Sequence, residues 1–167
     1  MNHLVFLQAD EIAKIRAGTK RVESRLWRGR FGHPCTRATT GDVFYLKRVG
    51  GGVKAVARVA HVHVFRLRSV ADLAALAARF GAAMDCAPDD PYWVVKQHST
   101  HARLFWLADV TPWKIPQAAL PRAIRIGWVA DWHPPLEADA TLLMPQVFPP
   151  PGKVAGDFGE QLPLVED

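Results

Sequence analysis

The segment GTKRVESRLW, residues 18–27, places charged side chains at alternate positions of what reads as a strand. Successive side chains of a strand point to opposite faces, so Val22 and Leu26 would face an ordinary core. The opposite face would carry two guanidiniums, a carboxylate between them and an indole, from Arg21, Glu23, Arg25 and Trp27. Such a face is either a solvated ladder of ion pairs or the floor of a binding pocket.

On the pattern alone the ladder of ion pairs is the simpler interpretation, but side chains of these types can also recognise nucleotides. Arginine makes bidentate contacts to phosphate or to a base acceptor, and Glu23 can accept a hydrogen bond from an exocyclic amine. Glu23 could also act as a general base toward water. Trp27 is the best candidate in the segment for stacking on a base, or else an aromatic that covers a barrel rim. A ladder of ion pairs alone would contribute roughly a few tenths of a kcal/mol.

A basic loop follows this strand directly. Arg28 and Arg30 lie in it, and we expect them to contact phosphates. The histidines and cysteines form pairs such as His33 with Cys35 and His61 with His63, but these pairs lie on unlike elements. We therefore expect no metal site and no cofactor.

Composition and charge bound the kind of protein. The chain has 167 residues, and a formal net charge of +5 that is unevenly distributed. Residues 133–167 hold one Lys and six acidic residues, whereas residues 1–132 hold 20 Lys and Arg and ten acidic residues. A body this basic is typical of a nucleic-acid-binding surface, although a basic soluble domain would look the same. The two cysteines form no disulfide framework, which favours the cytoplasm, and no apolar run is long enough for a membrane span.

The apolar patterns predict one α+β domain over residues 1–132. Strands are expected at 3–8, 20–27, 43–49, 53–65, 103–110 and 127–132, and helices at 9–17, 69–83 and 90–98. Residues 112–121, with three prolines, are expected to form a turn-rich connector. The short connections favour a small, partly closed mixed β-barrel with flanking helices over a doubly wound parallel sheet. Residues 133–167 are expected to be an irregular, proline-rich acidic tail, and this tail could compete with nucleic acid for the basic body.

The motif residues resemble those of the ASCH domain, a family of the PUA-like superfamily. Its signature is an I…G-x-K-x-x-E-x-R segment followed by GD, matched here by Ile15, Gly18, Lys20, Glu23, Arg25, Gly41 and Asp42. The resemblance covers about residues 3–132. It implies a PUA-like β-barrel with a cleft beside the K-x-x-E-x-R segment, and a role on RNA, other nucleic acid or nucleosides.

The resemblance also implies two classes of function. Some family members are amidohydrolases that act on N4-acetylcytidine, some have ribonuclease activity, and others are binding modules. In the amidohydrolase pattern the lysine matching Lys20 activates a threonine, but Glu23 stands at the threonine's position in this chain. A carboxylate cannot replace that hydroxyl in the same acyl-enzyme chemistry.

We therefore expect binding of RNA or of a modified nucleotide through a basic cleft. The expected binding residues are Lys20, Arg21, Glu23, Arg25, Trp27, Arg28 and Arg30. The alternative is a hydrolase, either an N4-acylcytidine amidohydrolase or a ribonuclease, with Lys20 and Glu23 as catalytic residues.

Overall fold

The computed structural model describes residues 1–29, 32–120 and 127–135. Its strands are β1 (Asn2–Leu7), β2 (Val22–Trp27), β3 (Val43–Arg48), β4 (Val53–Arg66), β5 (His101–Ile115) and β6 (Trp128–Ala130). Its helices are α1 (Ala9–Ala17), α2 (Val70–Met84) and α3 (Pro91–Lys96), with one-turn 3-10 helices η1 (Pro34–Arg37) and η2 (Gln117–Ala119). The predicted order of strands and α-helices is confirmed.

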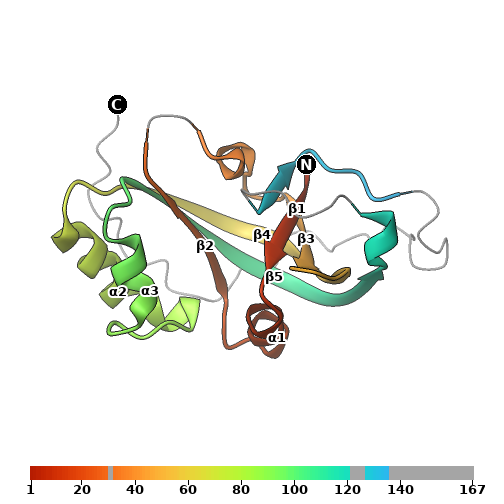
Figure 1. The fold of residues 1–167 in the computed structure, drawn as a ribbon, viewed down its shortest axis with the longest axis horizontal. Coiled ribbons are helices and arrows are strands. Elements are labelled where there is room, and N and C mark those ends of the chain that lie inside the picture. Colours follow the sequence, from red (N-terminus) through yellow and green to blue (C-terminus); the bar gives the residue numbers. More distant parts are fainter. Residues whose placement is uncertain (30–31, 121–126, 136–167) are drawn as a thin grey trace.

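The six strands form one mixed sheet that curls into a half-barrel, in the order β2-β5-β4-β3-β1-β6 (Figure 1). Every neighbouring pair is antiparallel except β1 and β3. The two longest strands, β4 and β5, pair along their whole length with several register shifts, which allow them to bend. The fold is α+β, with a partly closed mixed sheet and flanking helices, as predicted.

Strand β5 is longer than the sequence suggested. The connector expected from residue 112 begins after Ile115 instead, because β5 continues through Pro112. Pro112 lies opposite Ala55, beside a register shift between Val53 and Ala55. A bulge is a place where a strand tolerates a residue without an N–H donor, so this proline does not end the strand.

The alternation in β2 separates two environments. Val22 and Leu26 pack in the cluster that α2 and α3 form against one face of the sheet. Trp27, from the other face of β2, packs against the core inside the half-barrel, where Ile12 and Ile15 of α1 are buried. The face that carries Glu23 and Arg25 is therefore turned toward the interior of the half-barrel.

The glycine and aspartate of the GD pair lie at the turn that precedes β3. Gly41 has a φ of 92°, a conformation that favours glycine, and Asp42 follows it at the start of β3. The Asp42 carboxylate accepts a hydrogen bond from the backbone N–H of Thr39 at 2.7 Å and lies 3.1 Å from Nε2 of His3. This part of the motif holds β1 and β3 together and lies outside the pocket described below.

Residues 136–167, most of the expected tail, lie outside the described residues, so the tail hypothesis stays a prediction. Within the described ranges, no helix has both the length and the apolar character that a membrane crossing requires.

The β3–β4 turn supplies a test of the packing. A Cβ at Gly52 would overlap the carbonyl oxygen of Ile115, whereas a Cβ at Gly51 would meet only the Arg48 side chain, at 3.2 Å. We expect Gly52→Ala to lower the free energy of unfolding by about 2 kcal/mol and Gly51→Ala by less than about 1 kcal/mol. Urea denaturation of both variants measures the difference, and equal losses would contradict this packing.

Candidate functional site

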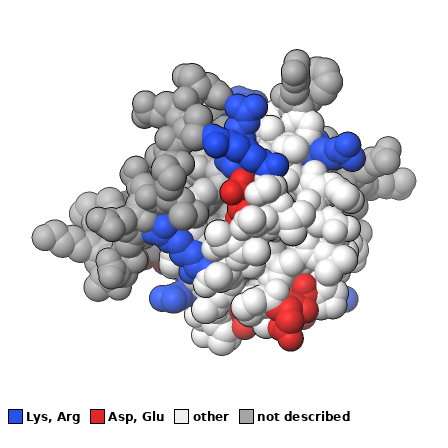
Figure 2. Space-filling view, turned by 90° about the vertical axis from the view of Figure 1, so that its left-hand side faces the viewer, with Lys and Arg blue, Asp and Glu red and all other residues white. Residues whose placement is uncertain are grey.

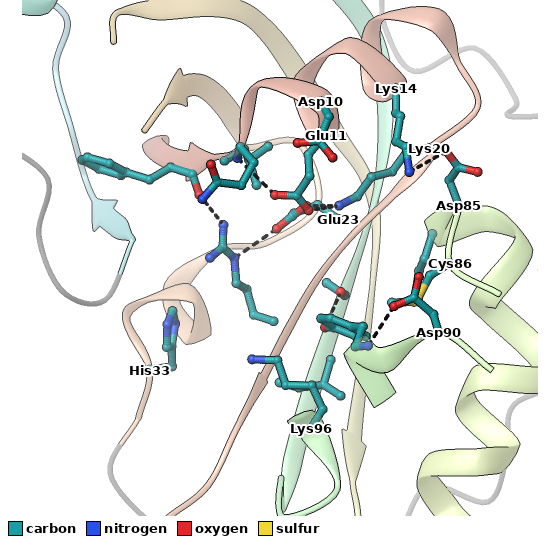
Figure 3. Close-up of a pocket in the computed structure, with 18 residues that line it drawn as sticks. Asp10, Glu11, Lys14, Lys20, Glu23, His33, Asp85, Cys86, Asp90 and Lys96 are labelled. Atoms are coloured by element: carbon teal, nitrogen blue, oxygen red, sulfur yellow. Dashed lines mark hydrogen bonds and ion pairs between the residues drawn. The ribbon is translucent and has the colours of Figure 1, made fainter. Parts of the chain in front are cut away.

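A pocket of about 490 Å³ lies along the free edge of β2 (Figure 3). Its wall is built from the end of β1, the start of α1, strand β2, the segment that follows α2, and helix α3. Because β2 is the last strand of the sheet, its edge is not covered by another strand. The pocket therefore lies beside the K-x-x-E-x-R segment, where the resemblance placed a cleft.

Four side chains of alternating charge form a chain of ion pairs along the pocket wall (Figure 3). Lys20 Nζ lies 2.7 Å from Glu11 Oε1 and 3.1 Å from Glu23 Oε2. Arg25 Nε lies 3.1 Å from Glu23 Oε1. The Glu23 side chain is 3% exposed and that of Lys20 is 8% exposed, so the centre of this charge chain is buried.

Local sequence explains how these charges meet. Glu11 is the third residue of α1 and its Oε2 accepts a hydrogen bond from the backbone N–H of Gln8, in a capping box that fixes its side chain. Gly18, with a φ of 79°, ends α1 and turns the chain so that Lys20 returns toward Glu11. Glu23 and Arg25 then follow at alternate positions of β2.

The ion pairs keep Lys20 protonated. Burial alone would lower the pKa of Lys20, but the charges of Glu23 and Glu11 and their hydrogen bonds outweigh burial and raise that pKa well above its usual range. For Glu11, burial would raise the pKa, yet the charge and hydrogen bond of Lys20 lower it overall. Lys20 is thus a hydrogen-bond donor and a fixed positive charge, and it is poorly suited to act as a base.

Arg25 is held from three sides. Its Nη2 donates to the carbonyl oxygen of Phe6 at 3.2 Å, and its guanidinium lies 5.4 Å from the ring centroid of Trp128. Glu23 is its third partner. These contacts reach across the gap between β2 and the opposite edge of the half-barrel, formed by β1 and β6, so Arg25 bridges the opening of the barrel.

Two buried polar atoms in this series of ion pairs lack a hydrogen bond of good geometry. They are Glu23 Oε2 and Arg25 Nε, although each is 3.1 Å from an opposite charge. A buried acceptor or donor without a well-aligned partner favours a ligand that supplies one. The Glu23 carboxylate can therefore accept a further hydrogen bond from a molecule in the pocket.

Hydroxyl groups reach the pocket as well. Ser24 points from the face of β2 opposite to Glu23, yet it also lines the pocket, because side chains from both faces are accessible at an edge strand. Its Oγ lies 3.0 Å from the phenolic oxygen of Tyr92 on α3. Burial is the main cause that raises the pKa of Tyr92 to about 12, so the phenol stays protonated.

The pocket is not the basic cleft expected from the net charge. Its described lining carries the cations Lys14, Lys20, Arg25 and Lys96, and the carboxylates Asp10, Glu11, Glu23, Asp85 and Asp90. Four positive and five negative side chains leave a formal charge near zero. Figure 2, which views the side of the molecule that is on the left in Figure 1, shows basic groups in separate places, one of them beside an acidic group, rather than a continuous basic stripe over the described atoms.

Three other residues expected to bind, Arg21, Trp27 and Arg28, do not line this pocket. Arg21 is exposed at the start of β2, with its guanidinium 5.8 Å from the ring centroid of Trp106. Trp27 is half-buried beside the pocket, and Arg28 is exposed just beyond β2. Arg30 lies outside the described residues. The structure thus brings together Lys20, Glu23 and Arg25.

Sequence reasoning missed several pocket residues. Glu11 carries a recognisable signal, as the acidic third residue of a helix with a capping box. Tyr92 and Lys96 of α3 have none, because they meet β2 only through the tertiary packing of a short helix.

The described residues contain no group of three or more His, Cys, Asp and Glu side chains arranged to hold a metal ion. His33 accepts a hydrogen bond at Nδ1 from the backbone N–H of Cys35, which gives this pair a local structural role.

Comparisons with solved structures identify the fold. The structure is similar to the crystal structure of ASCH from Zymomonas mobilis, with a TM-score of 0.52 and 16% identity over 81% of this chain and 83% of that chain. Two single-substitution mutants of the same protein match with TM-scores of 0.52 and 0.53, at 15% and 16% identity, and cover 86% and 84% of those chains. The chain adopts the ASCH fold. No protein-family model and no curated protein matches the sequence.

The resemblance drawn from Lys20, Glu23 and Arg25 is therefore confirmed at the level of the ASCH fold. At 16% identity the likeness to the Zymomonas protein concerns the architecture. The ligand has to be inferred from the chemistry of the pocket.

Removal of one partner from the ion-pair chain tests its coupling. Lys20→Met would leave Glu11 and the buried Glu23 without their shared cation, and we expect it to cost about 3–5 kcal/mol of unfolding free energy. Glu23→Gln leaves the Lys20–Glu11 pair intact and should cost less. The double variant should lose less than the sum of the single variants in urea denaturation. Strict additivity would show that the contacts are not coupled.

Acid should weaken the Lys20–Glu11 pair. The pKa of Glu11 is lower in the folded protein than its ordinary value near 4.3, so the stability that this carboxylate contributes is present above that value and lost as the pH falls through the lowered pKa. Glu11→Gln keeps a side chain that can complete the capping box. We expect wild type to be more stable than Glu11→Gln at pH 6 and the gap to close toward pH 3, which denaturation at both pH values measures. A gap that is unchanged with pH would contradict the assignment.

Proposed function

We propose that this protein binds a nucleobase, from RNA or from a modified nucleoside, in the pocket beside β2. The observation that carries the proposal is the fixed acceptor Glu23 between the fixed donors Lys20 and Arg25, on the wall of a cavity of about 490 Å³. Ligand pockets typically measure about 300–1,000 Å³ and combine a few oriented polar groups with apolar walls. A nucleoside fits these limits.

The chemistry of the wall favours a base over a phosphate. Glu23 can accept from an exocyclic amine or a ring N–H, while Arg25 can donate to a carbonyl or a ring nitrogen. The nearly balanced charge of the lining gives little attraction for a phosphate group. The pocket therefore suits an uncharged, hydrogen-bonding heterocycle.

The alternative, a hydrolase with Lys20 and Glu23 as catalytic residues, receives less support. Its raised pKa makes Lys20 a weak candidate for the base that activates a nucleophile. Thr19, the hydroxyl nearest to Lys20 in sequence, is exposed, and its Oγ1 lies 3.3 Å from both the Lys14 carbonyl oxygen and Asp85. We therefore favour binding without turnover.

The test uses N4-acylated cytidines, unmodified cytidine and short RNAs as probes. Calorimetry measures binding, and mass spectrometry of the same mixtures detects products. We expect binding that weakens about 10- to 100-fold in Glu23→Gln, the loss expected for a hydrogen bond to a charged group. Asp89→Asn, which removes one negative charge from an exposed loop residue outside the pocket, is the matched control and should bind as wild type does.

Two results would contradict this proposal. Affinity for every probe that is unchanged in Glu23→Gln would exclude the pocket as the binding site. Products that form with wild type and vanish in both Lys20→Ala and Glu23→Gln would make the protein a hydrolase. Circular dichroism of each variant establishes that the fold is kept.

A further inference from the structure

The inner face of the half-barrel carries a second set of recognition side chains next to the pocket. Strand register places them in two rows across β2, β5 and β4, one with Trp27, His101 and Arg66, the other with Arg25, Arg103 and Val64. Residues in one cross-strand row point to the same face, and alternate residues of a strand share that face. We call these six side chains the strip, and we add to it Arg28, which is exposed and follows Trp27 beyond the end of β2.

An aromatic series connects the strip to the pocket. The rings of Trp27 and His101 are stacked, with centroids 5.4 Å apart and planes 13° apart. The Trp27 ring also lies 5.8 Å from the ring of His33, which lines the pocket. Trp27 thus contacts two imidazoles, and the strip is continuous from the pocket wall on β2 across β5 to β4.

Two arginines are cross-strand neighbours in the strip. Arg25 and Arg103 are directly paired across β2 and β5, an arrangement in which like charges repel. Glu23 partly compensates Arg25, whereas Nη1 of Arg103 donates to the backbone carbonyl oxygens of Cys35 and Ala38, at 3.3 and 2.9 Å. A carbonyl oxygen does not neutralise the charge of Arg103. An anion placed between the two guanidiniums would relieve their repulsion.

The charge of the strip differs from that of the pocket. None of its seven positions carries a carboxylate, and four carry arginine. Arg25 also lines the pocket and pairs with Glu23, whereas Arg28 and Arg66 are exposed and outside the pocket lining. The pocket lining, by contrast, has one more carboxylate than it has Lys and Arg side chains. Phosphate groups would therefore be attracted to the strip and not to the pocket.

We propose that the strip binds the sugar-phosphate chain of a single-stranded RNA, one of whose bases enters the pocket. This inference rests on the proposed function and extends it from a nucleoside to a polynucleotide. A single strand fits because a base must be turned out of any stack to enter the pocket, and unpaired bases can be turned out at little cost. Arginine and aromatic side chains in alternation are a usual way to hold such a strand.

The test compares a polyanion with an uncharged probe. Fluorescence anisotropy follows a labelled single-stranded RNA of about 12 nucleotides at several salt concentrations, and calorimetry follows free cytidine or its N4-acyl derivative. In Arg28→Gln/Arg66→Gln we expect RNA affinity to fall about tenfold or more at low salt. The slope of log affinity against log salt should shrink by about 1.4, or 0.7 for each lost phosphate contact.

The matched control is Lys54→Gln/Lys114→Gln, which removes two positive charges from exposed residues near the other end of β4 and β5. It should leave RNA affinity and the salt slope close to those of wild type. Equal losses of RNA affinity in the two double variants would show that net charge alone attracts the RNA, and would overturn the proposal that the strip binds it.

The outcomes separate the two proposals. RNA affinity and salt slope unchanged in Arg28→Gln/Arg66→Gln, with nucleoside binding that depends on Glu23, would overturn the strip and leave the pocket standing. Loss of RNA binding in that variant, with no nucleoside bound by wild type, would support the strip and overturn the pocket. Absence of RNA binding by wild type would overturn the strip directly.

Discussion

The contact of the buried Glu23 carboxylate with Lys20 and Arg25 organises this part of the molecule. A carboxylate that is 3% exposed needs compensating charge. Arg25 supplies it from the same strand, and Lys20 supplies it from the segment just before that strand. Lys20 links the strand to α1 through Glu11, and Arg25 links it to β1 and β6 through the Phe6 carbonyl and the Trp128 ring. Side-chain contacts thus connect the two edges of the half-barrel, as backbone hydrogen bonds connect neighbouring strands elsewhere in the sheet.

This arrangement explains why the pocket lies where it does. Full pairing of β2 with β6 would close the barrel and cover the edge from which Glu23 and Ser24 reach the pocket. The gap is spanned by Arg25 instead, which leaves room for a ligand beside it. The same ion pairs that stabilise the open edge also orient the donor and acceptor groups. Stability and recognition depend here on one set of contacts.

Much of the fold follows from local patterns in the sequence, whereas the character of the site does not. Alternation across residues 20–27 correctly separated Glu23 and Arg25 from Val22 and Leu26, because a strand imposes that separation without reference to its neighbours. The predicted length of β5 was too short, since a proline ends a strand only where no bulge accommodates it. The pocket's near-neutral charge was also missed, because Asp85, Asp90 and Lys96 reach it only through the packing of elements distant in sequence.

The net charge of the body can now be assigned to particular places. An excess of arginine and lysine was expected to line the cleft, but carboxylates offset the cations there, and further arginines lie on the adjacent strip. Such a division suits a polymer whose units have an uncharged base and a charged backbone. A pocket that attracted phosphate would hold the wrong part of a nucleotide, so its balanced charge favours entry of the base. On this argument the acidic residues of the pocket contribute to specificity as much as the basic residues of the strip contribute to affinity.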